Sequence, residues 1–314
     1  MKCLRFSLVL AITLTLAVAG AAQQSTRLIS DIASKDSSIK METRLVSVPV
    51  SVVDREGHFK PGLDSSNFEV YDDGVKQKIE FFSSDDSPLS IGIVYDLSGS
   101  MQSQRKKSLA ALEKFLAGLR PVDEFFSVGV STKPMLLNDY TNNPEAVSSN
   151  AAFRETRGKT ALFDAIYLAM EKIRQGKSKR KMLIVISDGQ DNNSRYAFRD
   201  LRNYIQESDV QLYAVGTCGI WGFHNELAFQ GRAILRDLTS LTGGKVIFAP
   251  DDDQLETAFD IINAEMRSQY SLGFNVPNSR DARWHKLKIK LVNVDKDRAK
   301  SLTVTARQGY QNSR

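Results

Sequence analysis

The chain has 314 residues, of which 42% are hydrophobic and 25% are charged, a composition typical of soluble globular proteins. These proportions exclude a disordered or fibrous polymer and a protein with many membrane spans, and the length leaves room for two domains. The formal net charge is only +5, from 42 Lys and Arg scattered along the chain against 37 Asp and Glu. Proteins that bind nucleic acids more often gather basic residues in a stripe or an arm, so we expect no nucleic-acid partner.

The first 22 residues have the organisation of a secretory signal peptide. Lys2 and Arg5 give a positive start, residues 8–18 give an apolar core, and residues 19–22 are small. The apolar run is shorter than the ~20 residues of a spanning helix, and no other stretch is long enough, so we expect no membrane span in the mature chain. The protein is therefore predicted to be exported, either periplasmic or secreted, with residues 23–40 as a mobile leader.

Only two cysteines occur, and one of them would leave with the signal peptide. Cys3 belongs to that peptide, so Cys218 has no intramolecular partner in the mature chain. Cys218 either pairs between chains or is a buried or loop thiol without a role. The fold therefore does not depend on a disulfide, and the sequence leaves the oligomeric state open.

Residues 41–88 are predicted to form β-strands. Residues 45–53 alternate apolar with small or polar side chains, as a half-buried strand does, and Pro49 suggests that this strand lies at a sheet edge. Residues 68–71 and 75–82 flank the run Asp72-Asp73-Gly74. Asp-Gly between two strand-like runs predicts a hairpin.

Residues 89–267 alternate strand and helix patterns. Apolar strands are expected at residues 89–95, 125–130, 182–186, 210–215 and 246–248. Helices with one apolar face are expected around residues 109–119, 162–173, 198–205, 234–241 and 255–266. Because the strands are apolar throughout, the pattern predicts an α/β domain with a doubly wound, mostly parallel, Rossmann-like sheet that carries helices on both faces.

Strand patterns return in residues 268–314, at 270–276, 285–292 and 301–306. Together with residues 41–88, this segment has about the ~100 residues of one β-sandwich. We therefore expect the two flanks to form a β-sandwich-like module into which the α/β domain is inserted. The alternative is that the flanking strands extend the edge of the central sheet.

Oxygen-bearing side chains follow the predicted strands of the central domain, at the end where open α/β sheets bind ligands. Asp96 follows the first strand, with Ser98 and Ser100 at alternate positions after it. Thr160 lies just ahead of the helix at 162–173, and Asp188 follows the strand at 182–186. An Asp-x-Ser-x-Ser match alone is weak, and each hydroxyl taken singly suits a helix cap better than a metal. All five in order along one sheet edge are much harder to explain as caps.

These five residues offer only oxygen ligands and carry two negative charges. Such a set suits Mg²⁺, and Mn²⁺ or Ca²⁺ less specifically. Two carboxylates neutralise a divalent ion and leave coordination positions for water or for a group from outside.

The set resembles the von Willebrand factor A (VWFA) domain and its metal-ion-dependent adhesion site (MIDAS), over residues 89–267. Asp96-x-Ser98-x-Ser100, Thr160 and Asp188-Gly189 stand in the family's order. The resemblance implies that the two Ser, and sometimes the Thr, bind the metal directly, while the two Asp act directly or through water. It also implies that a carboxylate from a partner protein completes the coordination.

The flanks extend this resemblance. The runs 67–74 (NFEVYDDG) and 269–274 (QYSLGF) are similar to an exported bacterial subgroup labelled VWFA-related, first catalogued in Acidobacteria. The resemblance does not supply what that subgroup binds.

The leading interpretation is an exported, metal-dependent binding or adhesion module, in which a bound Mg²⁺ accepts an acidic side chain from a partner protein. One alternative is a structural component of an exported or envelope assembly, in which the ion only stiffens loops. Another is a metal-assisted hydrolase that uses Ser98. The chain has no His near the motif, no Gly-x-Ser-x-Gly elbow and no phosphate-binding loop, so we expect no enzymatic activity.

A loop that contains aromatic residues follows the predicted strand at residues 210–215. Residues 218–223 read Cys-Gly-Ile-Trp-Gly-Phe and should lie on the same edge as the metal. They form either a contact patch for a partner or a loop packed into its own domain.

Overall fold

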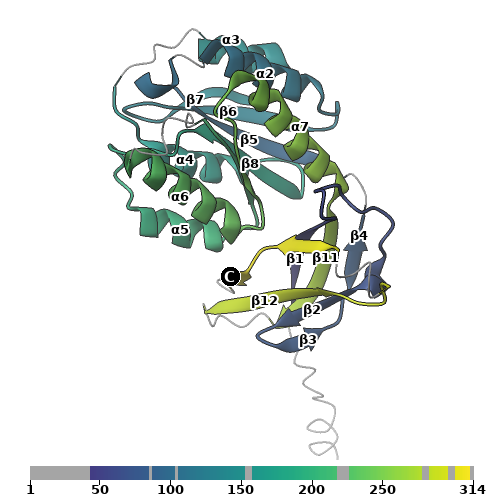
Figure 1. The fold of residues 1–314 in the computed structure, drawn as a ribbon. Helices are drawn as coiled ribbons and strands as arrows, with labels where there is room; N and C mark the ends of the chain where they lie inside the picture. Colours follow the sequence, from purple (N-terminus) through teal and green to yellow (C-terminus); the bar gives the residue numbers. More distant parts are fainter. Residues whose placement is uncertain are drawn as a thin grey trace, which may run out of the picture. The chain divides into compact units, whose positions relative to one another are not determined.

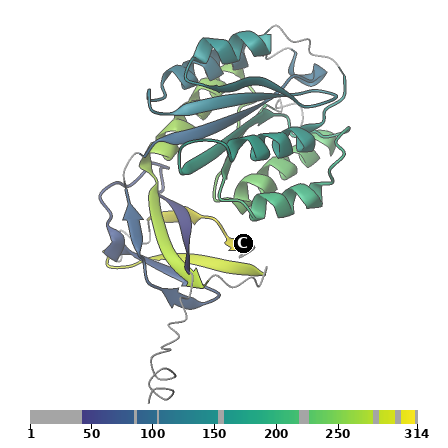
Figure 2. The ribbon, with the colours of Figure 1, turned by 180° about the vertical axis from the view of Figure 1, so that it is seen from behind.

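The computed structural model describes residues 43–84, 87–102, 105–152, 158–217, 226–277, 283–295 and 301–311. The predicted signal peptide, the predicted leader and the loop that contains Cys218 and Trp221 lie outside the described residues. The chain forms one α/β part and two antiparallel sheets, which are shown from opposite sides in Figures 1 and 2.

A six-stranded sheet lies at the centre of the α/β part, with strand order β10-β9-β8-β5-β6-β7. Neighbouring strands are parallel except at β7, which runs antiparallel to β6. The strands are β5 (Leu89–Asp96), β6 (Glu124–Val130), β7 (Met135–Thr141), β8 (Arg180–Ser187), β9 (Gln211–Gly216) and β10 (Val246–Phe248).

Helices cover both faces of this sheet, as Figures 1 and 2 show. Successive strand residues point to opposite faces, so Ile184 and Ile186 belong to one buried cluster while Leu183 and Val185 belong to the other. One face is covered by α2 (Arg105–Ala117), α3 (Pro144–Ala152) and α7 (Asp252–Ser268). The other is covered by α4 (Leu162–Ile173), α5 (Phe198–Gln206) and α6 (Glu226–Leu241). The predicted fold class of the central domain is confirmed.

The two flanks form two four-stranded antiparallel sheets, with orders β13-β1-β11-β4 and β14-β12-β2-β3. Side chains of both sheets share one core, in which Phe274 of the first sheet meets Tyr310 of the second at 6.1 Å between ring centres. The strands are β1 (Thr43–Val53), β2 (Phe68–Asp72), β3 (Val75–Gln77), β4 (Phe81–Ser83), β11 (Tyr270–Pro277), β12 (Trp284–Leu291), β13 (Thr303–Ala306) and β14 (Gly309–Gln311).

This arrangement agrees with the expected sandwich-like module. Among the described residues, no flanking strand pairs with the central sheet, so the alternative of an extended central sheet is wrong. The proposed limits of the central domain, residues 89 and 267, stay a prediction. They fall near the start of β5 and the end of α7.

Two predictions about the flanking strands need correction. β1 lies between β13 and β11, so it is not an edge strand. However, β13 pairs only with Val50–Val53, and Pro49 therefore has a neighbouring strand on one side only. Residues 75–82 do not form one strand, because β3 pairs with β2 in one sheet and β4 pairs with β11 in the other.

The predicted hairpin at Asp72-Asp73-Gly74 is confirmed. It joins β2 to β3, and both Asp73 (φ 48°) and Gly74 (φ 86°) have the positive φ that a two-residue turn of this kind requires.

Candidate functional site

Asp96 is the last residue of β5, and its side chain is fully buried. Its Oδ1 accepts a hydrogen bond from the Ser98 backbone N–H at 2.8 Å, and its Oδ2 accepts one from the Ser187 hydroxyl at 2.7 Å. Burial raises the pKa of Asp96 to about 6, the hydrogen bonds from Ser187 and Ser98 oppose the rise, and the negative charge of Asp188 adds to it. A buried carboxylate whose neighbouring charge is another carboxylate is stabilised by a bound cation.

Asp96 is followed by a short 3-10 helix, η2 (Gly99–Met101), which Ser98 precedes and which contains Ser100. Ser98 is 2% exposed and occupies the N-cap position, yet its side chain makes no capping hydrogen bond. Instead, a hydrogen bond from the Ser98 side chain helps to lower the pKa of Asp96. The Ser98 hydroxyl is therefore directed to the carboxylate, and capping does not explain it. Ser100 lies in η2, and its side chain lies outside what the structure describes.

Thr160 is 5% exposed and lies between the end of β6 and the loop after β8. Its N–H donates to Asn192 Oδ1 at 2.9 Å, and its carbonyl accepts from the backbone of Asn192 at 3.0 Å. The next residue, Ala161, donates to the carbonyl of Ser131, directly after β6, at 2.9 Å. Ala161 is also the N-cap residue of α4, so Thr160 does not cap this helix.

Asp188 follows the last residue of β8 and is 7% exposed. Its Oδ1 accepts from the backbone of Gln190 at 3.0 Å, and its Oδ2 accepts from the Gln190 side chain at 3.3 Å. Gly189 has φ 80°, and a Cβ there would lie 2.3 Å from the carbonyl oxygen of Gly231 in α6. A Cβ on Gly231 would lie 2.4 Å from the carbonyl oxygen of Asp188. The two glycines therefore let the Asp188 loop pack directly on α6.

Strand register brings the motif residues to one edge of the sheet. Tyr95 pairs with Ile186, so Asp96 stands level with the end of β8, where Asp188 follows. On the other side, Asp96 pairs with Val130, the last residue of β6. The next residue, Ser131, accepts a hydrogen bond from the N–H of Ala161, which follows Thr160. Asp96, Ser98, Thr160 and Asp188 thus lie around the carboxyl ends of β5, β6 and β8. Their oxygen donors and paired negative charges fit a hard divalent cation.

Sequence reasoning missed the residues that hold this edge together. Ser187 links Asp96 to the turn, because its hydroxyl also accepts from the Gly189 N–H at 3.0 Å. Asp191 and Ser194 accept hydrogen bonds from two backbone N–H groups in the first turn of α4, those of Phe163 (3.2 Å) and Asp164 (3.1 Å) respectively. The sequence feature that could have indicated these residues is the run of Asp, Asn and Ser after a predicted strand. Such runs are typical of turns in which side chains form hydrogen bonds with the backbone.

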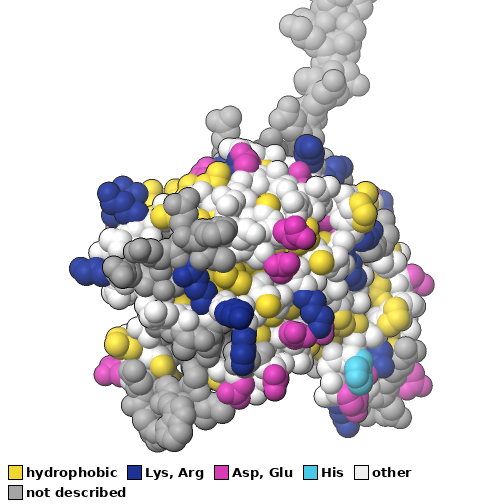
Figure 3. Space-filling view, turned by 90° about the horizontal axis from the view of Figure 1, so that it is seen from above, with side chains coloured by type: hydrophobic (Ala, Val, Ile, Leu, Met, Phe, Trp, Pro, Cys, Tyr) yellow, Lys and Arg dark blue, Asp and Glu magenta, His cyan; other side chains and the backbone are white. Residues whose placement is uncertain are grey.

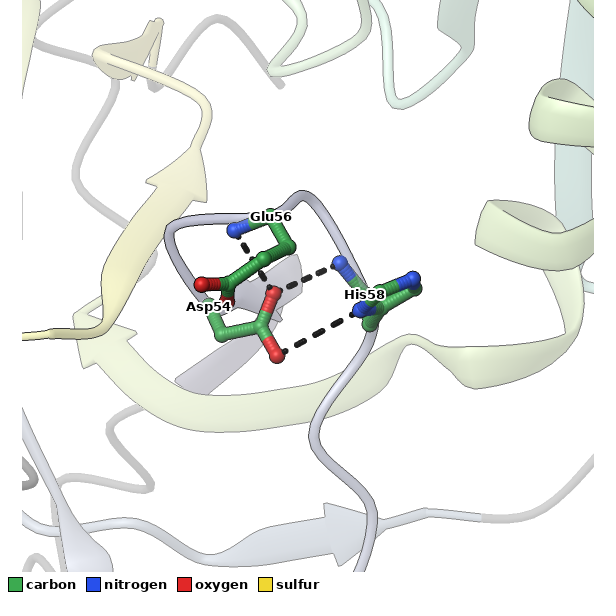
Figure 4. Close-up of side chains that lie close together, drawn as sticks. All are labelled: Asp54, Glu56 and His58. Atoms are coloured by element: carbon green, nitrogen blue, oxygen red, sulfur yellow. Dashed lines mark hydrogen bonds and ion pairs between the residues drawn. The ribbon is translucent and has the colours of Figure 1, made fainter.

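A separate group of acidic and histidine side chains, Asp54, Glu56 and His58, follows β1 (Figure 4). Asp54 Oδ1 accepts from the backbone N–H groups of Glu56 (3.1 Å) and His58 (2.8 Å), so its carboxylate organises a turn. Lys60 lies 2.7 Å from Asp54 Oδ2. The hydrogen bond from Lys60 is the largest cause that lowers the pKa of Asp54 to about 2. A lysine therefore already neutralises this carboxylate.

A second such group joins three strands of the sandwich. His285 Nδ1 lies 3.3 Å from both Asp72 Oδ1 and Asp73 Oδ2, and its ring stacks on Tyr310 at 5.0 Å. Tyr310 Oη donates to Asp72 Oδ2 at 2.9 Å. These contacts tie β2, β12 and β14 together and give the group a structural role.

The fold and the edge just described define a doubly wound α/β domain with a candidate ligand site at the carboxyl ends of its strands. The chain belongs to the family of the von Willebrand factor type A (VWA) domain, whose model matches residues 90–261, more than half of the chain. No curated protein matches this chain.

Several solved structures are similar to it at low identity. The conserved hypothetical protein BatB from Bacteroides thetaiotaomicron is 15% identical, with a TM-score of 0.46 over 57% of this chain and 100% of that one. The vWF domain of the type V pili tip protein Mfa5 from Porphyromonas gingivalis is 12% identical, with a TM-score of 0.45 over 56% and 94%. A von Willebrand factor type A protein from Catenulispora acidiphila is 12% identical, with a TM-score of 0.45 over 87% and 74%.

Two surface properties bear on partners. The helices within the described ranges are too short or too polar to cross a membrane. On the face drawn in Figure 3, Lys and Arg side chains are interspersed with Asp and Glu, without a continuous basic surface.

Proposed function

We propose that this chain is a metal-dependent protein-binding module. Mg²⁺, or Mn²⁺ or Ca²⁺ in its place, binds at the edge formed by Asp96, Ser98, Ser100, Thr160 and Asp188, and an acidic side chain of a partner protein completes its coordination. The single observation that carries the proposal is Asp96, a fully buried carboxylate that faces hydroxyl groups and the charge of Asp188.

The residues of this edge would hold the ion in distinct ways. Asp96 and Asp188 supply the two negative charges that offset the ion, and Ser98 brings a hydroxyl beside the Asp96 carboxylate. The hydrogen bonds from Ser187 and Ser98 fix the orientation of Asp96 before any ion arrives. VWA domains commonly bind a divalent metal, and membership of this family supports the proposed MIDAS.

The sequence has no nucleophile and base pair beside the motif, which favours binding over catalysis. We further propose that the protein acts outside the cytoplasm, in the periplasm or as a secreted protein, on the strength of its first 22 residues. The strand sequences of the flanks support assignment to the Acidobacteria-type VWFA-related subgroup.

A titration with Mn²⁺, followed by electron paramagnetic resonance, tests the metal site. We expect one site in the wild-type chain, loss of that site in Asp188→Asn, and unchanged binding in the control Asp54→Asn. The control removes the Asp54 carboxylate shown in Figure 4. Its negative charge is already balanced by Lys60 and by hydrogen bonds from the backbone of the turn. Retained binding in Asp188→Asn, or loss in Asp54→Asn, would place the ion elsewhere.

A pull-down from the exported fraction, with Mg²⁺ and again with EDTA, tests the partner. Capture only with Mg²⁺, and not by Asp188→Asn, supports a metal-bridged contact. Equal capture in EDTA supports the alternative, a structural component in which the ion only stiffens the loops.

A further inference from the structure

Five buried residues at the candidate metal site are joined by a closed ring of hydrogen bonds. Asp96 Oδ1 accepts from the Ser98 N–H, and Asp96 Oδ2 accepts from the Ser187 hydroxyl. The Ser187 carbonyl in turn accepts from the Thr217 N–H at 3.1 Å. The Thr217 hydroxyl donates to Met101 Sδ at 2.9 Å, and the Met101 N–H donates to the Ser98 carbonyl at 3.1 Å, which closes the ring.

Thr217 is placed in this ring by strand β9. It directly follows Gly216, the last residue of β9, which pairs with Ser187 at the end of β8. β5, β8 and β9 are consecutive strands of the central sheet, so the ring crosses three strand ends and returns through η2. Thr217 therefore ties η2 to the ends of β8 and β9.

The bond between Thr217 and Met101 is of an unusual kind for a buried hydroxyl. Most side-chain hydrogen bonds in proteins are made with the backbone or with water, and the buried hydroxyl of Thr239 donates to the Leu235 carbonyl in this way. The Thr217 hydroxyl donates to a thioether sulfur, which is a weak acceptor. The stability gained from such a bond is small, and its main consequence is to hold Met101, and with it η2, at the end of β9.

We propose that Thr217 and Met101 are positioning residues that make the metal site select Mg²⁺ over Ca²⁺. This inference rests on the proposed function, in which the ion binds beside Asp96 and Ser98. Mg²⁺ requires oxygen ligands at about 2.0–2.1 Å in nearly ideal octahedral geometry, whereas Ca²⁺ accepts more flexible ligands at about 2.3–2.6 Å. The closed ring holds Ser98 and η2 close to the Asp96 carboxylate, which suits the smaller ion. When the ring is opened, η2 gains the freedom to move outward, which suits Ca²⁺.

Displacement of Mn²⁺ from the full chain by Mg²⁺ and by Ca²⁺, followed by electron paramagnetic resonance, tests the proposal. The measured quantity is the ratio of the Ca²⁺ Kd to the Mg²⁺ Kd. Thr217→Val keeps the shape of the side chain but removes its donor, and it should lower this ratio about fivefold, the equivalent of one neutral hydrogen bond. Thr217→Ser keeps the donor and should retain the wild-type ratio.

Two further substitutions separate the ring from a general loss of stability. Met101→Leu removes the acceptor and should lower the ratio as Thr217→Val does, and the double variant should lower it no further, because both changes open the same bond. Thr242→Val is a matched control at the other end of β9. The buried Thr242 hydroxyl accepts from the Leu212 N–H at 2.9 Å, so this variant should lose stability in urea unfolding but keep the wild-type ratio.

A lower ratio in Thr217→Val and Met101→Leu, with the wild-type ratio in Thr217→Ser and Thr242→Val, supports the selection of Mg²⁺ by this ring. The wild-type ratio in both Thr217→Val and Met101→Leu, or an equal fall in Thr242→Val, overturns the inference while the metal site stands. If Thr217→Val does not fold, the ratio of Met101→Leu decides. Absence of Mn²⁺ binding in the wild type overturns the proposed function as well.

Discussion

Replacing Asp96 by Asn should stabilise the metal-free protein near neutral pH. The carboxylate is fully buried, and its pKa is raised from 3.8 to about 6, chiefly by burial. This difference corresponds to roughly 3 kcal/mol of unfolding free energy lost when the group ionises, at about 1.4 kcal/mol per pKa unit. Asn carries no charge but makes a poorer partner for the Ser187 hydroxyl, which costs about 1 kcal/mol. The net expected gain is about 2 kcal/mol.

The sign follows from the direction of the shift. Because the folded-state pKa lies above the unfolded value, the contribution of Asp96 is fully present below about pH 4 and is lost as the pH rises through about 6. In EDTA, the wild type should therefore lose stability between pH 4 and pH 7, and Asp96→Asn should lose less. Urea unfolding followed by circular dichroism at several pH values measures both curves.

Metal should reverse the ranking at neutral pH. At a Mg²⁺ concentration one hundred times its Kd, the wild type gains about 2.7 kcal/mol, and Asp96→Asn gains nothing. A metal-free Asp96→Asn protein that is less stable than wild type at pH 7.5 would refute the argument, because the buried charge would then carry no cost.

Asp123 provides a matched control among buried aspartates. Its side chain is fully buried at the other end of β6, and Arg267 Nη2 lies 2.5 Å from its Oδ2. Burial alone would raise the pKa of Asp123, but the hydrogen bonds from Arg267, Leu89 and Arg120 outweigh it and lower the pKa. Asp123→Asn should therefore destabilise the protein at pH 7.5, by roughly 2–3 kcal/mol, with or without Mg²⁺.

Three further substitutions test the packing and hydrogen bonds described above. Gly189→Ala places a side chain at φ 80° and against the Gly231 carbonyl, so urea unfolding should show a loss of roughly 2 kcal/mol or more. Ser187→Ala removes a donor to Asp96 and should raise its pKa further, weakening Mn²⁺ binding several-fold at pH 6 in calorimetry. Tyr270→Phe removes the bonds of Tyr270 Oη to the Lys60 carbonyl (2.6 Å) and the Leu63 N–H (3.1 Å), so thermal unfolding should show a loss of about 2 kcal/mol.

The parts of the fold that were predictable are those with a strong hydrophobic period. β8 and β9 are buried along nearly their whole length, and α4 has one continuous apolar face, so local pattern and final environment agree. β7 and α3 were missed for the opposite reason. β7 is a half-exposed edge strand, and α3 is short and rich in small and polar residues, so neither shows a clear period.

Other errors came from contacts between segments distant in sequence. Residues 75–82 keep one strand-like pattern, but the backbone N–H of Glu80 donates to the carbonyl of Gly273 at 2.8 Å, which draws the chain into the other sheet. Pro49 is tolerated inside β1 because β13 is too short to reach it. Neither fact is visible in a local window of sequence.

The candidate site was predictable as far as the positions of its residues. In a parallel sheet the carboxyl ends of neighbouring strands meet at one edge, so Asp96 and Asp188 had to come close once β5 and β8 were known to be neighbours. The roles of Ser187 and Asp191 were not predictable, because they depend on how the turn after β8 folds back onto α4.

A comparison of Asp96 with Asp123 indicates that stability alone does not explain why position 96 carries an aspartate. Both aspartates are buried, Asp96 at the end of β5 and Asp123 just before β6. Asp123 meets an arginine, whereas Asp96 meets hydroxyls and the charge of a second carboxylate. A chain selected only for stability would be expected to place an uncharged residue at position 96, since the raised pKa of Asp96 predicts that removing the charge stabilises the metal-free protein. Asp96 lies at the edge where α/β sheets bind ligands. A cation bound there would make the negative charge of Asp96 favourable.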